Sequence, residues 1–272
     1  MKKHLSTIIL VLAFFIGVSL LLYPSVSDYI NSLHQTQAIA QYEKDVAKLS
    51  DEEFNRLWDE AKEFNRMLAK KENQWIISDD EKEEYERVLN ANGSGAMGYI
   101  EIPKINCYLP IYHGTDDGVL QTSIGHLEGS SLPIGGEDTH CILSGHRGLP
   151  SAKLFSELDK LNTGDTFFLH TLEQVLTYEV DQILIVLPSE VEALKIESGK
   201  DQCTLVTCTP YGINSHRMLV RGHRIENETE EPTVRVVADA IQIEPVVVAP
   251  IVAAPILLLL MIWVLIGSRK KK

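Results

Sequence analysis

Two long uncharged runs, one towards each end of the chain, constrain the fold more than any other feature of the sequence. Residues 5–23 carry no charge over 19 positions, which as a helix would span roughly 28 Å, about the thickness of a bilayer core. Residues 246–267 form a second uncharged run of 22 residues, in which Pro250 and Pro255 favour a kink or a late helix start. Neither run has the polar face of a buried core helix. We expect both runs to span a membrane.

Basic residues outside these runs predict the orientation of the chain. Lys2 and Lys3 precede the first run, and residues 269–272 are Arg-Lys-Lys-Lys. By the positive-inside rule both termini are expected in the cytoplasm and residues 24–245 outside it. The first run could instead be a cleaved signal peptide, because residues 25–27 offer a small-x-small site, but its length favours an uncleaved anchor.

The charge of the chain argues against one class of partner. The formal net charge is −13, and setting aside the six basic residues at the two ends makes it −19. A surface this acidic repels nucleic acid and anionic lipid, so we expect no nucleic-acid partner. The carboxylates are expected to be mostly a solvated surface, with attraction of cationic protein partners as a weaker alternative.

Between the first run and about residue 90 the sequence predicts helices. Ser50 and Glu53 form a capping box, after which apolar residues recur at spacings of three and four up to Leu68. This pattern is typical of an amphipathic helix that packs on a partner surface. Residues 70–90 are highly charged around one apolar cluster, Trp75-Ile76-Ile77.

From Met97 the sequence changes to short β-rich runs separated by Gly, Pro, Asn and Asp. Such runs predict a mainly β fold, a closed or partly closed antiparallel β-barrel over residues 97–225. Residues 151–161 are the only clear helix that we expect within it. The expected organisation is a cytoplasmic N-terminus (1–4), a membrane helix (5–23), an extracytoplasmic helical region (24–96), the barrel (97–225), a linker (226–245), a second membrane helix (246–267) and a basic cytoplasmic tail (268–272).

A cysteine at the end of an apolar strand is the first candidate for chemistry. Residues 204–208 are rich in β-branched side chains, turn residues follow, and residues 217–225 have the pattern of a return strand. A hairpin of this kind would place Arg217 beside the thiol of Cys208. Arginine stays protonated and cannot act as a base, so its natural task is to hold the thiolate, a substrate carbonyl or an oxyanion.

The proton-transfer residue of such a site is expected to be a histidine. His146 is the strongest candidate because it follows a strand-like run and is flanked by Gly145 and Gly148, as a residue presented at a barrel rim would be. Three other histidines are weaker candidates: His113, His126 and His140.

Other interpretations of the same residues are open at this point. Cys208 could be an inert buried thiol, and the arginines of the return strand could form a solvated face. A zinc set drawn from Cys203, Cys208, His216 and His223 matches no usual ligand spacing, so we expect no metal. Cys203 and Cys208 are five apart on one strand and should point to opposite faces, which argues against a disulfide between them. The remaining two cysteines are expected to be buried: Cys107 and Cys141.

The stretch "TLVTCTPYGINSHRMLVRGHR" resembles the Thr-Leu-x-Thr-Cys signature of sortases. Further blocks in order, among them "MGYIEIPKI" and "THCILSGHRGLPSAKLFSELDKL", resemble the pilin-polymerising class C branch over roughly residues 97–225. The second uncharged run also fits class C. The resemblance implies that Cys208 is the nucleophile, His146 the proton-transfer residue and Arg217 the oxyanion or substrate-orienting residue, with no metal or organic cofactor.

The resemblance also implies a reaction and its partners. The thiolate would attack the Thr–Gly carbonyl of an LPXTG-like sorting signal on a pilin and form a thioester. A lysine amine of another pilin subunit would then resolve the thioester to an isopeptide bond. Two alternative functions are a thiol hydrolase that processes surface proteins with the same residues, and a non-catalytic membrane-bound scaffold that docks pilins.

One part of the chain departs from the class C pattern. Class C enzymes usually carry a lid with an Asp-Pro-aromatic motif in the active-site groove, and this sequence has no Asp-Pro-Trp or Asp-Pro-Phe. By position the lid candidates are Asn73, Gln74 and Trp75, within residues 70–90. We expect Trp75 to cover the Cys208 site in the resting enzyme. Without the aspartate and the proline, we expect it to be held by packing alone.

Overall fold

A computed structural model of the chain describes residues 2–91 and 93–227, together with residues 255 and 258. The chain divides into two compact units, residues 1–30 with 229–272 and residues 31–228. Apart from positions 255 and 258, the expected second membrane helix (246–267) lies outside the described residues. The same holds for the basic tail (268–272) and for most of the expected linker.

The first uncharged run lies in a long helix, α1 (Lys2–Val46). Its part Val11–Val46 contains a window that is long and apolar enough to cross a membrane, judged by length and composition. Large apolar side chains such as Ile16 and Leu20 are exposed there. The expected N-terminal apolar helix is therefore confirmed.

The last part of α1 belongs to the same unit as the β strands. Ile39 and Tyr42 are buried. The Tyr42 hydroxyl donates to the carbonyl oxygen of Met97 (2.9 Å) and accepts from the backbone N–H of Leu172 (2.7 Å). Burial raises the pKa of this phenol far above its ordinary value, so it remains a neutral donor. One side chain thus fixes the last part of α1 to two segments of the strand domain.

Capping boxes start the next two helices. α2 (Asp51–Leu68) follows Ser50, whose side chain accepts from the backbone N–H of Glu53, and α3 (Asp79–Arg87) follows Ser78 with Glu81 in the same role. The capping box predicted at Ser50 is therefore confirmed. From α3, the buried hydroxyl of Tyr85 reaches the strand domain, where it lies 3.1 Å from Nδ1 of His126.

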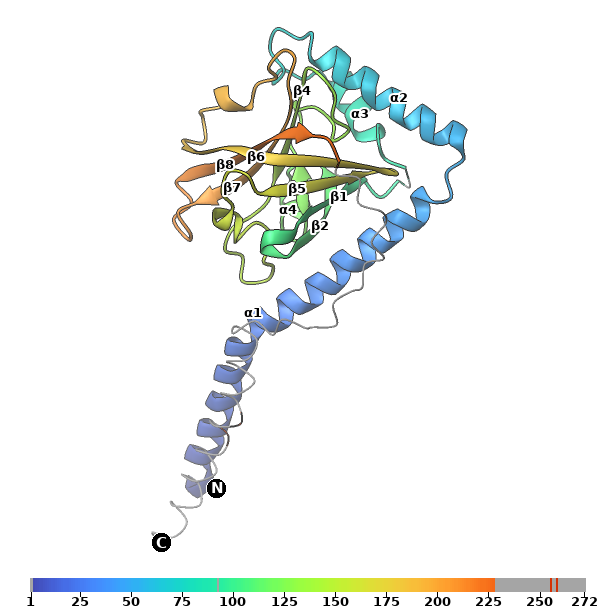
Figure 1. Cartoon of the computed structure of the whole chain (residues 1–272). Coiled ribbons are helices and arrows are strands. Elements are labelled where there is room, and N and C mark those ends of the chain that lie inside the picture. The colour runs from blue at the N-terminus through green and yellow to red at the C-terminus, as the bar shows by residue number, and fades with distance from the viewer. Residues whose placement is uncertain (1, 92, 228–254, 256–257, 259–272) are drawn as a thin grey trace. The chain divides into compact units, whose positions relative to one another are not determined.

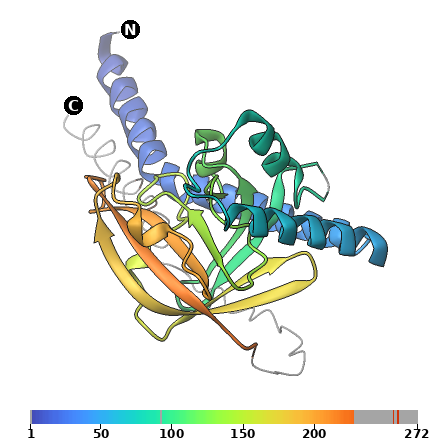
Figure 2. The same cartoon turned by 90° about the horizontal axis from the view of Figure 1, so that it is seen from above.

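Eight strands close into a barrel, with α2 and α3 lying beside it (Figures 1 and 2). The strands are β1 (Ala96–Ile102), β2 (Cys107–His113), β3 (Ile124–His126), β4 (Thr139–Ser144), β5 (Thr166–Thr171), β6 (Gln174–Val186), β7 (Asp201–Thr209) and β8 (His216–Ile225). Their order around the barrel is β1-β2-β3-β4-β7-β8-β6-β5. The closed, mainly β barrel expected from the sequence is confirmed.

Two of the strand pairs, β2 with β3 and β4 with β7, run parallel, so the barrel is not wholly antiparallel. Parallel neighbours require a long connection. Between β4 and β7 that connection contains β5 and β6, which pair with other strands of the barrel.

The helix expected over residues 151–161 is wrong. This stretch forms turns and one short 3-10 helix, η2 (Leu158–Lys160). Leu154 has a positive φ of 40°, which a right-handed helix excludes. The apolar spacing in fact reflects burial of Leu154, Phe155 and Leu158 in the core. Three further short helices are η1 (Pro103–Ile105), α4 (Asp117–Leu120) and η3 (Glu192–Leu194).

Side chains alternate between the two faces of the barrel wall, as the pleat of a strand requires. Leu143 of β4, Leu205 of β7 and Val220 of β8 point into the main core. Their neighbours on the other face form a second cluster, which we call the outer cluster. It consists of Ile142, Leu194 and Leu219, with Trp75, Leu127, Leu184, Val186, Ala193 and Val206 packed against them.

All four cysteines are free. Cys107 and Cys141 are buried, as predicted, and burial raises the pKa of Cys107 to about 12. Cys203 is fully buried in the main core, whereas Cys208 is partly exposed. The prediction that Cys203 and Cys208 point to opposite faces is confirmed.

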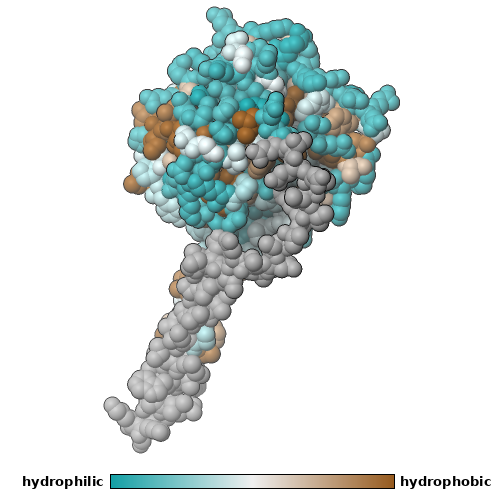
Figure 3. Space-filling model, viewed as in Figure 1, coloured by the Kyte–Doolittle hydropathy of each residue, from teal (hydrophilic) through white to brown (hydrophobic). Residues whose placement is uncertain are grey.

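On the face of the barrel domain seen in Figure 3, the surface is mainly hydrophilic, with separate apolar spots. Several acidic side chains are held in ion pairs there, as Asp181 is by Arg221 on β8 (3.0 Å). The acidic surface expected from the composition therefore includes paired carboxylates as well as solvated ones.

Candidate active site

Cys208 and Arg217 are brought together by the hairpin of β7 and β8. They are directly paired in the antiparallel register, next to the pair formed by Thr209 and His216. Directly opposite residues share a face of the sheet, with Cβ atoms about 4.5 to 5.5 Å apart. Both side chains are partly exposed. The structure therefore places Arg217 opposite Cys208 on the same face of the sheet, as the turn between the two strands predicts.

His146 reaches the same place from β4. The parallel register of β4 and β7 ends with the pair of Ser144 and Val206, and the next residue, Gly145, donates its N–H to the Val206 carbonyl (3.0 Å). The Thr207 hydroxyl donates to the Gly145 carbonyl (2.7 Å). His146 directly follows Gly145, and Cys208 directly follows Thr207, so both lie one residue beyond this bonded pair.

Three neighbouring strand ends therefore carry the three predicted residues. β4, β7 and β8 are adjacent in the barrel, and they contribute His146, Cys208 and Arg217 respectively. A thiol, an imidazole and a permanent cation are the groups that acyl transfer through a thioester requires.

The Arg217 guanidinium is held at the hairpin turn. Its Nη1 donates to the carbonyl oxygens of Asn214 (3.3 Å) and His216 (3.2 Å). Asn214 has a positive φ of 59°, which asparagine tolerates better than most residues. The guanidinium has five N–H donors in a planar fork, so one nitrogen can hold the turn while others face a substrate.

The other candidate histidines are structural. His113 contacts the carbonyl oxygens of Gly95 and Val88 through its two ring nitrogens (2.9 and 2.8 Å). His140 lies 2.9 Å from the Lys195 carbonyl, and His126 is fully buried. Burial lowers the pKa of both His113 and His140. These side chains hold segments of the fold together, and of the four candidate histidines only His146 follows the end of β4.

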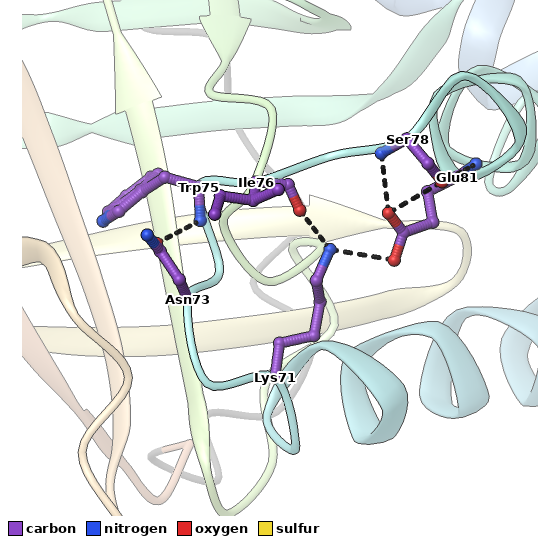
Figure 4. A network of polar contacts seen from close by, with 6 residues as sticks. All are labelled: Lys71, Asn73, Trp75, Ile76, Ser78 and Glu81. Carbon is purple, nitrogen blue, oxygen red and sulfur yellow. Dashed lines mark hydrogen bonds and ion pairs between the residues drawn. The ribbon is translucent and has the colours of Figure 1, made fainter.

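The segment from Lys71 to Glu81 is held by a polar network (Figure 4). The Asn73 side-chain oxygen accepts from the backbone N–H of Trp75 (3.1 Å). Lys71 donates to the carbonyl oxygen of Ile76 and pairs with Glu81 (2.8 Å). Bonds from Lys71 and Ser78 lower the pKa of the Glu81 carboxyl to about 2.

Gln74 fastens this segment to the barrel domain. Its side chain is buried. Its Nε2 donates to the Gly129 carbonyl (3.1 Å), and its Oε1 accepts from the Ile196 backbone N–H (3.1 Å). The expectation of packing alone concerned Trp75, whose side chain packs against the outer cluster and whose buried indole Nε1 has no hydrogen-bond partner among the described residues. The neighbouring Gln74 amide adds two hydrogen bonds to backbone groups of the barrel domain, which the sequence did not predict.

Trp75 packs against the outer cluster. One member of that cluster is Val206, two residues before Cys208 on β7, so both side chains lie on the same face of the strand. The segment is flanked by two cavities, one of about 1020 Å³ towards Val191 and Lys195 and one of about 150 Å³ towards α2 and α3. Trp75 thus lies on the face that carries Cys208, and coverage of the thiol itself stays a prediction.

Arg147 is a further residue near the site that was not predicted from the sequence. Its side chain donates to the hydroxyl of Thr209 (3.3 Å) and to the carboxylate of Asp159 (2.5 Å). A signal was available, because the arginine directly follows the candidate histidine in Gly-His-Arg-Gly and Thr209 directly follows the candidate cysteine.

Within the described residues, no group of three or more His, Cys, Asp or Glu is arranged to hold a metal ion. The conceivable zinc set is not assembled, since Cys203 points into the main core while Cys208 lies on the other face.

Comparison with known proteins adds independent support. A family model described as a sortase domain matches residues 100–225. The crystal structure of sortase C1 from Streptococcus agalactiae is 52% identical, with a TM-score of 0.69, and the match covers 71% of this chain and 100% of that one. Sortase C of Clostridium perfringens, solved with the C-terminal cell wall sorting motif, is 43% identical over 71% of this chain and all of that chain, with a TM-score of 0.62.

Among curated proteins, sortase D of Bacillus subtilis (strain 168) is 33% identical over 133 residues, 48% of this chain. The match spans 64% of the length of that relative. The barrel fold, the family model and a solved relative that the match covers along its whole length all indicate the same family, and the solved structures that this chain resembles are class C sortases. This chain therefore belongs to the sortase family of cysteine transpeptidases.

Proposed function

We propose that this protein is a membrane-anchored transpeptidase that joins pilin subunits, with Cys208 as nucleophile, His146 as proton-transfer residue and Arg217 as oxyanion-stabilising or substrate-orienting residue. The observation that carries the proposal is the arrival of these three residues at adjacent strand ends, with Cys208 and Arg217 directly paired. No metal or organic cofactor is needed for this chemistry.

In the first half of the reaction, the Cys208 thiolate attacks the Thr–Gly carbonyl of an LPXTG-like sorting signal. Negative charge develops on the carbonyl oxygen, and the Arg217 guanidinium stabilises it, a role that the direct pairing of Arg217 with Cys208 supports. The Thr–Gly bond breaks, His146 protonates the departing glycine amine, and a thioester to Cys208 remains.

In the second half, a lysine amine of another pilin subunit attacks the thioester. His146 takes a proton from the incoming amine, the carbon–sulfur bond breaks, and an isopeptide bond joins the two subunits. Water competes with the amine for the same thioester. The relative from Clostridium perfringens was solved with the C-terminal cell wall sorting motif, which supports a sorting-signal substrate for this chain.

The same proposal places the protein at the cell membrane. The apolar helix α1 supplies an N-terminal anchor, and residues 246–267 would supply a second span. Basic residues outside both runs favour cytoplasmic termini and an extracytoplasmic domain over residues 24–245, with the catalytic barrel at 97–225.

We propose further that Asn73, Gln74 and Trp75 form a lid over the catalytic groove. The contact of Trp75 with the outer cluster, on the face that carries Cys208, supports this assignment. The two cavities that this segment lines leave it room to move once the hydrogen bonds of Gln74 and Lys71 break.

The decisive experiment supplies the purified enzyme with a pilin that carries a sorting signal and a second pilin that carries the acceptor lysine. The wild-type enzyme should produce isopeptide-linked ladders, and Cys208→Ala should produce none while keeping the wild-type circular dichroism spectrum. His146→Ala should be nearly as inactive. Ladders from Cys208→Ala would overturn the choice of nucleophile.

The same assay separates the two alternatives. A thiol hydrolase would release free acid with no ladder in the presence of the lysine-bearing pilin. A docking scaffold would fail to trap a sorting-signal peptide on Cys208, whereas the proposed enzyme should form one thioester per chain, visible by intact-protein mass spectrometry.

A further inference from the structure

Arg147 is a nearly buried cation beside the proposed catalytic residues. Its side chain is only 11% exposed, which is rare for arginine unless the charge is paired. Nη2 donates to Asp159 (2.5 Å), and Nη1 donates to the Thr209 hydroxyl (3.3 Å). Asp159 lies in the short helix η2 and is more exposed than its partner.

Arg147 lies just beyond the point at which the backbone pairing of β4 with β7 ends. In the described part of the chain, the pairing of the two strands ends at Ser144 and Val206. The hydrogen bonds of Gly145 to Val206 and of Thr207 to Gly145 extend it by one residue. Beyond that point β7 continues to Thr209, while the other chain leaves the sheet into the His146 loop.

The bond of Arg147 to Thr209 spans this gap. Arg147 directly follows His146, and Thr209 directly follows Cys208. The bond therefore links the immediate neighbours of the two proposed reacting groups. The pair with Asp159 anchors the other end of the guanidinium to η2, so that the fork cannot swing away from β7 without breaking a charged bond.

We infer that Arg147, held by Asp159, is a positioning residue that sets the distance and alignment between the His146 imidazole and the Cys208 sulfur. This inference rests on the proposed function. A displacement of about 1 Å between reacting groups can lower a rate by about a hundredfold, so a bond adjacent to both groups has a large effect on the reaction without touching the substrate.

The fold itself does not need the charge at this position. The Arg147 Nε is buried and has no hydrogen-bond partner among the described residues, a cost that an apolar side chain avoids. Buried ion pairs can often be replaced by apolar residues of similar volume without loss of stability. Since Asp159 is partly solvated, Arg147→Met leaves no carboxylate stranded in the core. The variant should therefore fold.

The experiment compares Arg147→Met with Arg147→Lys and with a control, Arg87→Met. Arg87 is an exposed arginine on α3 that also pairs with a carboxylate, Glu60. For each protein we would measure the thermal midpoint, the single-turnover rate of thioester formation with a sorting-signal peptide, the peptide concentration at half-maximal rate, and the pH profile of that rate.

For Arg147→Met we expect a thermal midpoint close to that of the wild type, a thioester-forming rate lower by about 30- to 100-fold, an unchanged half-saturating concentration and a displaced pH profile. Arg147→Lys should recover part of the rate, because lysine keeps one bond but not the planar fork. Arg87→Met should behave as the wild type.

A wild-type rate and pH profile in folded Arg147→Met would overturn the inference. A decrease in rate no larger than the decrease in the fraction of folded protein would also overturn it. Should Arg147→Met fail to fold, Asp159→Asn and Thr209→Val each remove one of the two hydrogen-bond partners of Arg147. For each we expect a several-fold lower rate of thioester formation and the same displacement of the pH profile. Cys208→Ala distinguishes a failure of the proposed function from a failure of the positioning role of Arg147. If it still forms the thioester, the proposed function fails; if it does not and Arg147→Met is fully active, only the positioning role fails.

Discussion

Cys208 and Arg217 face each other as a directly opposed pair in the antiparallel ladder of β7 and β8. The ladder fixes the spacing of the two Cβ atoms through the backbone before any substrate arrives. The turn between the strands also holds the guanidinium, through Asn214 and His216. Preorganised charge of this kind stabilises a transition state without reorganisation during the reaction.

Arg217→Lys should therefore fail although it keeps the positive charge. Lysine is a point charge on a flexible stem and cannot hold the turn carbonyls and a developing oxyanion with one planar group. We expect at least a hundredfold loss in the rate of thioester formation, on the order of 3 kcal/mol. Single-turnover kinetics with a sorting-signal peptide measure this, and near-normal activity would mean that only the field of a cation matters at this position.

The proposed lid predicts faster access to Cys208 when its fastenings are removed. Trp75→Ala should speed labelling of the thiol by a small alkylating reagent a few-fold. Gln74→Met should speed it by up to about thirtyfold, because it removes two hydrogen bonds worth roughly 1 kcal/mol each. Ile76→Ala is the matched control, since this side chain lies in the same segment but is exposed.

The lid assignment fails if Trp75→Ala and Gln74→Met both label at the wild-type rate. Equal acceleration by Ile76→Ala would point instead to a general loosening of residues 71–78. Labelling followed by mass spectrometry of the Cys208 peptide separates these outcomes.

Gly145 predicts a strong steric effect one residue before His146. A Cβ at this position would lie 2.6 Å from Cδ1 of Ile124 and 2.7 Å from Cδ2 of Phe155. Both neighbours are fully buried, so Gly145→Ala should cost roughly 1 to 3 kcal/mol of unfolding free energy. Urea denaturation measures this loss. Gly118→Ala is the control, because nothing lies within 4 Å of its added Cβ, and an equal loss there would refute the steric explanation.

The buried histidines predict a pH dependence of stability. Burial lowers the pKa of His113 and His140 in the folded state, so the unfolded chain binds more protons than the folded chain once the pH falls below about 6.5. The free energy of unfolding should then decrease as the pH falls from about 7 towards the lowered folded-state pKa values. Urea titrations over pH 7 to 5.5 measure this slope, above the range in which most carboxylates titrate.

Replacing both histidines by glutamine should flatten that slope, whereas replacing the exposed His34 should leave it unchanged. An unaltered slope in the double variant would assign the pH dependence to other groups.

Much of the site could be predicted from the sequence because it is encoded locally. The hairpin that pairs Cys208 with Arg217 follows from one strand, one turn and one return strand. The placement of His146 follows from a strand end followed by glycine. The barrel follows in the same way from short β-rich runs and turn residues, although such runs carry no information about which strands become neighbours. The parallel pairing of β4 with β7 was therefore not predictable.

The remaining features depend on partners that are distant along the chain. Gln74 bonds to Gly129 and to Ile196, which are 55 and 122 positions away, so the amide alone gives no sign of its role. Residues 151–161 have helical spacing of apolar side chains, yet they fold as turns. Leu154 has a positive φ, and both Leu154 and Phe155 are buried in the core. Local pattern cannot distinguish these two ways of burying the same residues.

The alternation of side chains along β7 has a practical consequence. Three of the four thiols are buried, with Cys107, Cys141 and Cys203 exposed by 7%, 2% and 0%, while Cys208 is partly open. A fluorescent thiol reagent used on the native enzyme should therefore attach at one position. Under the proposed function, the dye then counts catalytic sites directly, and each sorting-signal mimic can be ranked by the fraction of that signal it blocks.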